Sequence, residues 1–425
     1  MNAQTQTDLA QLRRAASAGT PDAQLALADA LVAQGQPEEA HGLLLAPARA
    51  GNADAQVALA RLSLYGFDSV RDQAQAVDWL LQAERAQHPV AAYLLAMISL
   101  GGVAVDREFE LMGPRLLAAA RAGLAPALRA LAMYFGRDRS NAMAMRQSES
   151  LLAQAAAQRD GVSAALLAER VRHGEVVGDV QYSLESLEAV AAGVGITRMP
   201  ALKGVPVIRG GEEHLRLDLQ SSVRAPAIGV ACEAPRIVMA NGLLSSEECR
   251  YVIAMGTPHL GPSRVADPVS GEWIPDPIRT SQDVSFIPVL EDFQLRLLQL
   301  RMAGAMGLDF THAEPMVLLH YTPGQEYLPH RDYLSPETLA DYRPDAGQRY
   351  ATLCCYLNEV EAGGRTVFPK CNGVITPGIG RAVGFRNLDD AGRPDPDTLH
   401  AGMPVERGEK WLATLWFREH RYRAF

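Results

Sequence analysis

Lysine is almost missing from this chain of 425 residues. Of its 40 basic residues only three are lysine, Lys203, Lys370 and Lys410, and the other 37 are arginine. The formal net charge is -9, so there is no basic excess with which to bind nucleic acid in general. With so few lysines, one that follows other functional residues at a short distance is informative.

Cysteine and long apolar runs are also scarce. The five cysteines include no Cys-x-x-Cys pair, and their odd number argues against a disulfide framework or a structural zinc site. The first residues, MNAQTQTDLAQLRRAASAG, contain no apolar segment of signal-peptide length, and no later run is long enough to span a membrane. We therefore expect a cytoplasmic protein that does not bind membranes.

The first half of the chain repeats an alanine-rich pattern that closes each time on a glycine. Its segments start at Ala18, Ala50, Ala86, Ala122 and Ala157, at intervals of 32, 36, 36 and 35 residues. This period predicts pairs of helices, with the glycine in a left-handed turn after the first helix. The pattern resembles the Sel-like repeats of the tetratricopeptide class. Such repeats generally hold a polypeptide partner; the alternative is that they only pack against the neighbouring domain.

The pattern changes near residue 196. PVIRGGEEHLRLDL, residues 206–219, is typical of a linker or a first strand, and Ser245 with Glu248 has the spacing of a capping box that opens a helix. After residue 315 the short apolar runs PMVLLHY, YATLCCYL, RAVGFRN and WLATLWF alternate with turns and not with helices, which predicts an antiparallel sandwich or barrel. We expect helical repeats over 1–195, a linker and first strand over 196–235, and a β domain over 236–425.

Two residues with metal-binding side chains lie close together in YTPGQEYLPHRDYL, residues 321–334. His330 and Asp332 share one face of an extended segment and can reach the same ion. A single pair of this kind is weak evidence, because short motifs occur by chance. Two similar pairs are not predicted to bind metal: His173 with Glu175 ends a repeat, and His312 with Glu314 lies in a turn.

The residues downstream make the first pair more specific. They supply a second histidine, His400, and Lys410 follows it by ten residues. Two histidines and one carboxylate form the ligand set of non-haem Fe(II) oxygenases, which keeps positions open for a chelating 2-oxo acid and O2. The far carboxylate of that acid needs a fixed positive charge, which a lysine supplies.

These motifs together resemble the prolyl 4-hydroxylase-type 2-oxoglutarate/Fe(II) dioxygenases. The similar pieces follow one another in the family's order over residues 236–425: LLSSEEC, RTS, YTPGQEYLPHRDY, RYATLCCYLNEVEAGGRTVFP and LHAGMPVERGEKWLATLWF. The resemblance implies a double-stranded β-helix (jelly roll) with supporting helices, preceded here by an α-solenoid. It implies hydroxylation of an unactivated C–H, with a prolyl residue of a polypeptide as the expected substrate and release of succinate and CO2. Fe(II), 2-oxoglutarate and O2 would be required, with ascorbate as reductant.

The resemblance also implies roles for single residues. Its metal ligands are His330, Asp332 and His400. Its 2-oxoglutarate-binding residues are Lys410, Tyr321 and Thr366, and its peptide-binding residues are Tyr327, Arg349 and Trp416. The loop over residues 264–281 would fold over the substrate.

Some positions are expected to have no part in binding, or depart from the family. Arg331 separates the two ligands where the family often has an aromatic residue, so we expect a different wall of the substrate groove with ligation kept. His320 is expected to be a core histidine. The cysteines near the site in sequence are expected to be buried apolar residues without a role there: Cys354, Cys355 and Cys371.

Two other functions remain open from the sequence. One is hydroxylation of a free amino acid or another small molecule, which needs no repeat domain. The other is a repeat scaffold with an inactive oxygenase domain. The complete set of three ligands and a lysine argues against the scaffold, since a lost ligand would have favoured it.

Overall fold

A computed structural model describes residues 3–65, 72–178, 180–200, 202, 217–266, 273–275 and 278–425. By contacts between Cα atoms the chain divides into two compact units. The first comprises residues 1–127 together with Phe425, and the second comprises residues 128–424. The segment expected to be a linker or first strand, residues 206–219, lies almost entirely outside the described residues.

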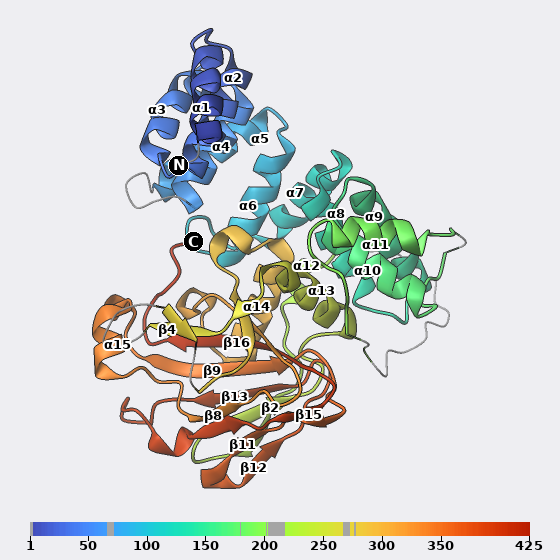
Figure 1. Cartoon of the computed structure of the whole chain (residues 1–425), viewed down its shortest axis with the longest axis vertical. Coiled ribbons are helices and arrows are strands. Elements are labelled where there is room, and N and C mark those ends of the chain that lie inside the picture. Colours follow the sequence, from blue (N-terminus) through green and yellow to red (C-terminus); the bar gives the residue numbers. More distant parts are fainter. Residues whose placement is uncertain are drawn as a thin grey trace. The chain divides into compact units, whose positions relative to one another are not determined.

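The first unit is built from helices that pack against their neighbours along the chain (Figure 1). Its helices are α1 (Ala3–Ala16), α2 (Pro21–Ala33), α3 (Pro37–Arg49), α4 (Ala53–Tyr65), α5 (Gln73–Arg85), α6 (Pro89–Gly101) and α7 (Phe109–Arg121). The same alternation continues through α8 (Ala125–Gly136), α9 (Ala142–Ala157), α10 (Gly161–Arg172) and α11 (Leu184–Ala192). Each predicted repeat segment opens the first helix of a pair: α2, α4, α6, α8 or α10. The predicted helix pairs are therefore confirmed.

The closing glycines follow the prediction at three described repeats and depart from it at one. Gly35, Gly102 and Gly174 have φ angles of 71°, 65° and 64°, which is the left-handed turn expected after a helix. Gly66 lies outside the described residues. Gly136 instead ends α8, where a Cβ would lie 2.6 Å from a guanidinium nitrogen of Arg170. A glycine is needed there for close packing and not for a turn.

A second left-handed position, which was not predicted from the sequence, recurs in the turn before each repeat. It falls at Gly19, Gly51, Gln87, Gly123 and Arg159, with φ between 59° and 90°. The spacing of 32 or 36 residues matches the repeat period. Two of these residues carry side chains and still adopt the conformation that glycine favours. The turn between repeats is therefore set by the packing of the helices and not by glycine alone.

The second unit contains two antiparallel sheets that face each other. The larger has the strand order β1 (Gly229–Cys232), β2 (Ile237–Ala240), β13 (Ala382–Arg386), β9 (Arg349–Tyr356), β16 (Lys410–Arg418), β7 (Val317–Tyr321), β6 (Gln282–Ser285) and β3 (Gly261–Pro262). The smaller has the order β12 (Gly373–Ile375), β11 (Thr366–Phe368), β14 (His400–Gly402) and β8 (Tyr327–His330). Two short hairpins pair β10 (Ala362–Gly363) with β15 (Val405–Arg407) and β4 (Arg264–Ala266) with β5 (Trp273–Pro275). The predicted fold class, a helical solenoid followed by an antiparallel jelly roll, is confirmed.

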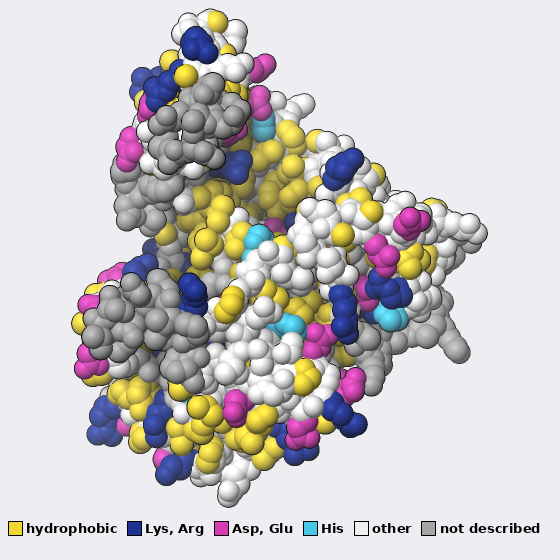
Figure 2. Space-filling view, viewed as in Figure 1, with side chains coloured by type: hydrophobic (Ala, Val, Ile, Leu, Met, Phe, Trp, Pro, Cys, Tyr) yellow, Lys and Arg dark blue, Asp and Glu magenta, His cyan; other side chains and the backbone are white. Residues whose placement is uncertain are grey.

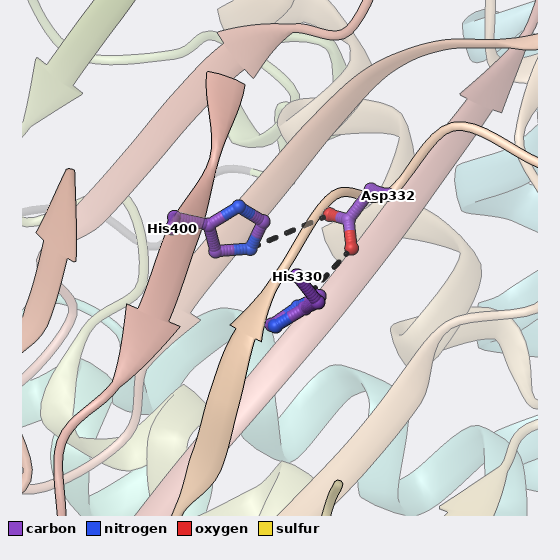
Figure 3. A group of neighbouring side chains, drawn as sticks. All are labelled: His330, Asp332 and His400. Carbon is purple, nitrogen blue, oxygen red and sulfur yellow. Dashed lines mark ion pairs between the residues drawn. The ribbon is translucent and has the colours of Figure 1, made fainter. Parts of the chain in front are cut away.

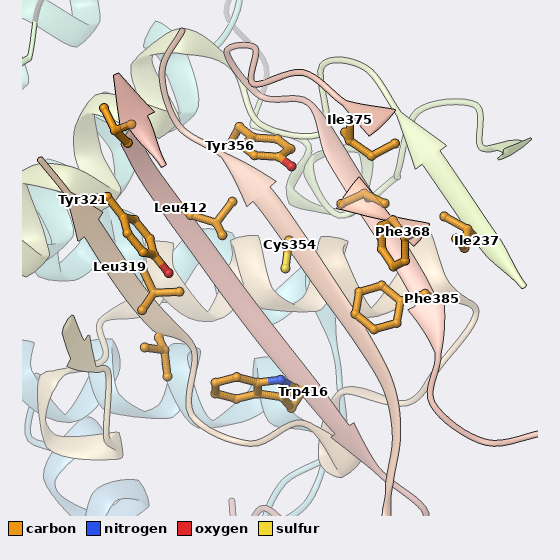
Figure 4. Packing of buried hydrophobic residues seen from close by; sticks show 13 residues of the cluster. Ile237, Leu319, Tyr321, Cys354, Tyr356, Phe368, Ile375, Phe385, Leu412 and Trp416 are labelled. Carbon is orange, nitrogen blue, oxygen red and sulfur yellow. The ribbon is translucent and has the colours of Figure 1, made fainter. Parts of the chain in front are cut away.

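Apolar side chains from both sheets meet between them (Figure 4). Phe368 and Ile375 come from the smaller sheet, and Phe385, Leu412 and Trp416 from the larger; each is at most 8 % exposed. Alternate residues of one strand point to opposite faces of its sheet. The residues next to Phe385, Leu412 and Trp416 in the chain therefore lie on the outer face of the larger sheet. This core holds the two sheets at the separation that the site between them requires.

Two helices cover the outer face of the larger sheet, as predicted. They are α13 (Ser246–Gly256) and α14 (Phe293–Met306). A Cβ on Gly256 would lie 2.2 Å from Leu318 of β7, and one on Gly384 of β13 would lie 2.3 Å from the sulfur of Met306. The capping box at Ser245 and Glu248 is present and opens α13. The remaining helical turns are α12 (Leu219–Ser222), α15 (Pro336–Asp341), η2 (Thr257–His259), η3 (Pro288–Leu290), η4 (Phe310–His312), η5 (Pro344–Ala346), η6 (Pro369–Cys371) and η7 (Pro396–Thr398).

Buried ion pairs join the last repeat helices to α13 within the second unit. Arg170 of α10 lies 2.7 Å from Glu247 of α13, and both side chains are fully buried. Arg250 of α13 pairs at 2.6 Å with Glu175, which follows α10. The contact-based division at residues 127 and 128 reflects these links, since α9 to α11 belong to the same compact unit as the sheets. The boundaries expected near residues 195 and 236 stay predictions.

On the face drawn in Figure 2, basic and acidic side chains lie scattered among hydrophobic and other side chains. Within the described residues, no helix is both long and apolar enough to cross a membrane.

The buried pair of Arg170 and Glu247 predicts a large effect of a single substitution. Replacing Arg170 by Met removes the nearest cation of the buried Glu247 carboxylate, which keeps Arg139 at 3.5 Å and Arg250 at 3.7 Å. The loss should be about 3 kcal/mol of unfolding free energy, the low end of the range for a broken buried pair. The matched control is Arg393→Met in the same unit, where the arginine of the pair with Asp389 is 76 % exposed and the loss should be under about 1 kcal/mol. Urea unfolding of the full chain measures both; equal losses would contradict the prediction.

Candidate metal centre

Three side chains with metal-binding atoms meet between the two sheets. His330 ends β8, Asp332 follows it by two residues, and His400 begins β14. The two strands pair antiparallel with His400 directly opposite His330. Asp332 lies 3.5 Å from the Nε2 of His330 and 3.9 Å from the Nε2 of His400 (Figure 3). One atom from each residue falls within 4.8 Å of the other two, so one ion can contact all three.

Backbone carbonyls fix the orientation of both imidazoles. The Nδ1 of His330 is 2.8 Å from the carbonyl oxygen of Leu328, and the Nδ1 of His400 is 3.0 Å from that of Thr398. A carbonyl only accepts, so Nδ1 is the donor in each ring. The Nε2 atoms therefore keep their lone pairs and face the carboxylate. This is the tautomer that a metal ligand needs.

Two buried residues that were not predicted from the sequence hold the carboxylate of Asp332, one directly and one through the other. Thr352 on β9 donates its hydroxyl to Asp332 at 2.7 Å, and Asn387 donates to that hydroxyl at 3.0 Å. Burial alone would raise the pKa of Asp332. The imidazoles of His400 and His330 outweigh that effect and hold the pKa of this carboxyl well below its usual range. Asp332 is therefore ionised and oriented.

The His400 ring sits among aromatic side chains. Phe368 stacks on it at 5.4 Å and Phe385 contacts it edge-on at 4.7 Å, measured between ring centroids. Burial in this apolar surrounding lowers the pKa of His400 to about 4. The ring is neutral at pH 7 and does not repel a cation.

The three residues line one cavity together with most of the other predicted site residues. Its wall is formed by Arg279, Leu319, Tyr321, Tyr327, His330, Asp332, Cys354, Thr366, His400, Gly402, Lys410, Leu412, Thr414 and Trp416. Cys354 is thus at the site in space, although it was expected to be near it in sequence only. The reason is that alternation along β9 turns this residue inward, beside Thr414 at 3.6 Å.

Lys410, Tyr321 and Thr366 line this cavity, and Tyr356, which is not among the described lining residues, lies next to them. Lys410 is directly opposite Tyr321 across the ladder of β16 and β7. Its Nζ lies 5.2 Å from the ring of Tyr321 and 5.5 Å from that of Tyr356, whose hydroxyl donates to Thr366 at 2.5 Å. Burial lowers the pKa of Lys410 to about 8, so the amine is still largely protonated at pH 7. Tyr356 was missed as a single residue, although the quoted motif RYATLCCYLN contains it.

The three residues expected to bind peptide take different positions. Tyr327 stacks on His330 with ring centroids 3.4 Å apart, and Trp416 lines the cavity. Arg349 is not among the cavity-lining residues that are described. Its guanidinium covers the Trp416 ring at 4.1 Å and pairs with Glu314 at 2.8 Å. The structure therefore places Arg349 behind Trp416, and its contact with a substrate stays a prediction.

Among the described residues, Glu314 and His320 do not line the cavity, whereas Cys354 does. Glu314 is used by two arginines and His173 pairs with Glu169. His320 is only partly buried and is not a core residue. It stacks on Trp411 at 4.0 Å and pairs with Glu409 at 2.9 Å. The wrong assignment arose because the flanking leucines of β7 suggested a strand buried on both faces.

The expected substrate lid is described only in part. Within residues 264–281, the backbones of β4 and β5 pair with each other, and the segments 267–272 and 276–277 lie outside the described residues. At the end of this stretch Arg279 lies on the cavity wall, with its guanidinium 5.5 Å from the Tyr327 ring. Arg279 also bonds to Asp283 at 2.7 Å.

The donor set fits a divalent iron. Two imidazole nitrogens and one carboxylate face the same point, and among the described residues no fourth histidine, cysteine or carboxylate joins the group. Such a set leaves positions open on the cavity side for further ligands. A structural zinc site would instead close its shell with four protein ligands.

Comparison with known proteins also indicates an iron-dependent oxygenase. The model of the 2OG-Fe(II) oxygenase superfamily matches residues 316–418. "Probable prolyl 4-hydroxylase 10" of Arabidopsis thaliana is 33 % identical over 208 residues, which is 44 % of this chain and 71 % of the relative. "Prolyl 4-hydroxylase 1" of the same plant is 34 % identical over 200 residues, 44 % of this chain and 70 % of the relative. A Sel1 repeat protein from Oxalobacter formigenes has 17 % identity and a TM-score of 0.34, and covers 41 % of this chain and 74 % of that one.

The site and the matched region define a 2-oxoglutarate/Fe(II) oxygenase. Relatives above 30 % identity are matched over more than two thirds of their length. The chain belongs to the prolyl 4-hydroxylase family.

The hydroxyl of Thr352 predicts a loss of metal affinity on removal. Thr352→Val keeps the shape of the side chain but takes away the donor to Asp332. Metal binding should weaken about 10- to 100-fold, as is usual for groups that orient a ligand. Calorimetry with Co(II) under anaerobic conditions measures the dissociation constant. The control Thr376→Val alters an exposed threonine and should leave binding unchanged; an unchanged constant for Thr352→Val would count against the orienting role.

Proposed function

We propose that the chain is a 2-oxoglutarate- and Fe(II)-dependent dioxygenase that hydroxylates a prolyl residue in a polypeptide and releases succinate and CO2. The observation that carries this proposal is one cavity whose wall holds both a metal-binding triad and a buried cation. A triad of His330, Asp332 and His400 lies on its wall together with the buried cation of Lys410. A dicarboxylate that chelates an ion at the triad can then reach the lysine with its far carboxylate.

The residues have distinct roles in this proposal. His330, Asp332 and His400 would hold the iron, which when bound supplies the O2 activation needed to oxidise 2-oxoglutarate and an unactivated C–H. Lys410 binds the far carboxylate of 2-oxoglutarate, with Tyr321 and Thr366 as hydrogen-bond partners. Lys410 and Thr366 are 2 % and 6 % exposed, so this end of the cavity excludes water and strengthens the charge pairing.

Two observations support a prolyl substrate: the similar proteins are prolyl 4-hydroxylases, and two aromatic residues line the cavity. Tyr327 and Trp416 supply aromatic surfaces on the cavity wall, and such surfaces suit the ring of a proline. Arg349 is proposed to position Trp416 through its cation–π contact. The helical repeats are proposed to hold the polypeptide that presents this proline.

Two finer proposals concern the reductant and the compartment. We propose that ascorbate restores Fe(II) after turnover without product. We propose a cytoplasmic location, supported by the free state of all five cysteines, which suits a reducing compartment.

Succinate formation tests the proposed function. Wild-type protein with Fe(II), 2-oxoglutarate, O2 and ascorbate should form succinate faster when a proline-rich peptide is added, and His330→Ala should abolish turnover because one of three ligands is lost. Mass spectrometry should find one added oxygen on proline. Turnover stimulated only by small molecules would overturn the polypeptide substrate. No turnover and no bound iron would overturn the enzyme assignment.

The lowered pKa of Lys410 predicts how 2-oxoglutarate binding depends on pH. The amine has a pKa of about 8 in the free protein, below its usual 10.5, so it is charged below pH 8 and neutral above it. The dissociation constant of 2-oxoglutarate should be constant below pH 8 and rise about tenfold per pH unit above it. Anaerobic calorimetry with Co(II)-loaded protein measures it. Lys410→Arg keeps its charge to high pH and should lack the rise; the same rise in that variant would assign it to another group.

A further inference from the structure

Arg331 stands between the two ligands His330 and Asp332 in the chain. It departs from the aromatic residue that the family often has at this position. Its side chain is not among the described residues that line the cavity. Alternation along an extended segment explains this, since His330 and Asp332 face the cavity and the residue between them faces away. Arg331 therefore does not contact a ligand in the cavity, and any function it has must act through other residues.

The ladder that brings the ligands together is short. Strands β8 and β14 share two register pairs, His400 with His330 and Gly402 with Tyr327, and the register shifts between them. β8 is also the edge strand of the smaller sheet. The ladder stops at His330, so Asp332 lies beyond its end. Backbone pairing alone does not fix the chain around Asp332 relative to the chain around His400.

Arg331 connects the chain around Asp332 with the chain that leads to His400. Its Nε donates to the carbonyl oxygen of Pro396 at 2.8 Å. Within the described part of the chain, this is the one hydrogen bond recorded from residues 331–334 to residues 395–399. A bond from a charged guanidinium is stronger than one between neutral groups. The bond joins the segment of two ligands to the segment that precedes the third.

The segment that accepts the bond from Arg331 has hydrogen bonds of its own and leads to His400. Pro396 opens η7; the Asp395 carboxylate accepts a hydrogen bond from the Asp397 amide, and the Asp395 carbonyl accepts one from the Thr398 hydroxyl. The carbonyl of Thr398 is the one that orients the Nδ1 of His400. A shift of Pro396 is therefore passed to Thr398 and to the ring of His400.

We infer that Arg331 is a positioning residue that sets the distance between the His330–Asp332 segment and His400 through its bond to the Pro396 carbonyl. This deepens the proposed function, because it rests on those three residues being the metal ligands. The bond acts on the protein before any metal or co-substrate binds. Its loss therefore lowers the affinity for the metal itself and not only the rate of turnover.

The test compares metal affinities of the full chain without turnover. Apo-protein is mixed with Co(II) under anaerobic conditions, and the dissociation constant and the visible absorption of bound Co(II) are recorded. Arg331→Met keeps the length of the side chain without the donor. It should weaken binding about tenfold, at the low end of the range for groups that orient metal ligands, and should alter the absorption bands, which report coordination geometry.

The matched control is Arg393→Met. Arg393 lies three residues before Pro396, is well exposed, and donates its Nε to Asp389 at 3.0 Å. The same chemical change is made there without a link to either ligand segment, so the Co(II) constant and spectrum should match those of the wild type. If Arg393→Met weakens binding as much as Arg331→Met does, the inference fails, because general loss of charge near the site then explains the result.

A second variant separates positioning from folding. Arg331→Lys keeps the positive charge and the apolar stem but has no Nε–H, and it should also weaken Co(II) binding. It replaces Arg331→Met if that variant lowers the melting temperature of the metal-free protein. Wild-type affinity in a folded Arg331 variant would overturn the inference. Absence of 1:1 Co(II) binding by the wild type, or unchanged binding in His330→Ala, would instead overturn the proposed function on which it rests.

Discussion

The pairing of β8 with β14 is the contact on which the site depends. It sets His400 opposite His330, although 70 residues separate them in the chain. Two imidazoles and a carboxylate come within 4.8 Å only because this ladder closes the smaller sheet. The core between the sheets then decides how far this ladder lies from Lys410 on the larger sheet. A slip of β8 by one residue would turn His330 out of the cavity.

Burial gives the site its chemical character. An apolar surrounding keeps His400 neutral and brings the pKa of Lys410 down to about 8. The same burial would penalise the charge of Asp332, and it is offset by the neighbouring imidazoles and by the hydroxyl of Thr352. Asp332 and His400 are thereby ready for a cation in their binding forms. At pH 7 no proton has to leave His400 before a metal binds.

Much of the fold was accessible from the sequence because its signals are local. The alanine-rich period places five helix starts, and the spacing of Ser245 and Glu248 places the start of α13. The errors share one cause, which is packing by residues distant in sequence. Gly136 leaves space for the Arg170 side chain and does not form a turn. His320 lies on the partly exposed face of its strand, and Cys354 points into the cavity. A single-sequence pattern contains no information about such partners.

The sequence by itself determined the element types, the candidate ligands and Lys410, since the spacing of these residues along strands follows from backbone geometry. The tertiary structure decided what surrounds them. Thr352 donates to Asp332 and accepts in turn from Asn387, and Arg331 bonds to Pro396, 65 residues away. It also decided that α9 to α11 belong with the sheets, through the buried pair of Arg170 and Glu247. Hydrogen bonds and buried charges need particular partners in space, and only folding brings those partners together.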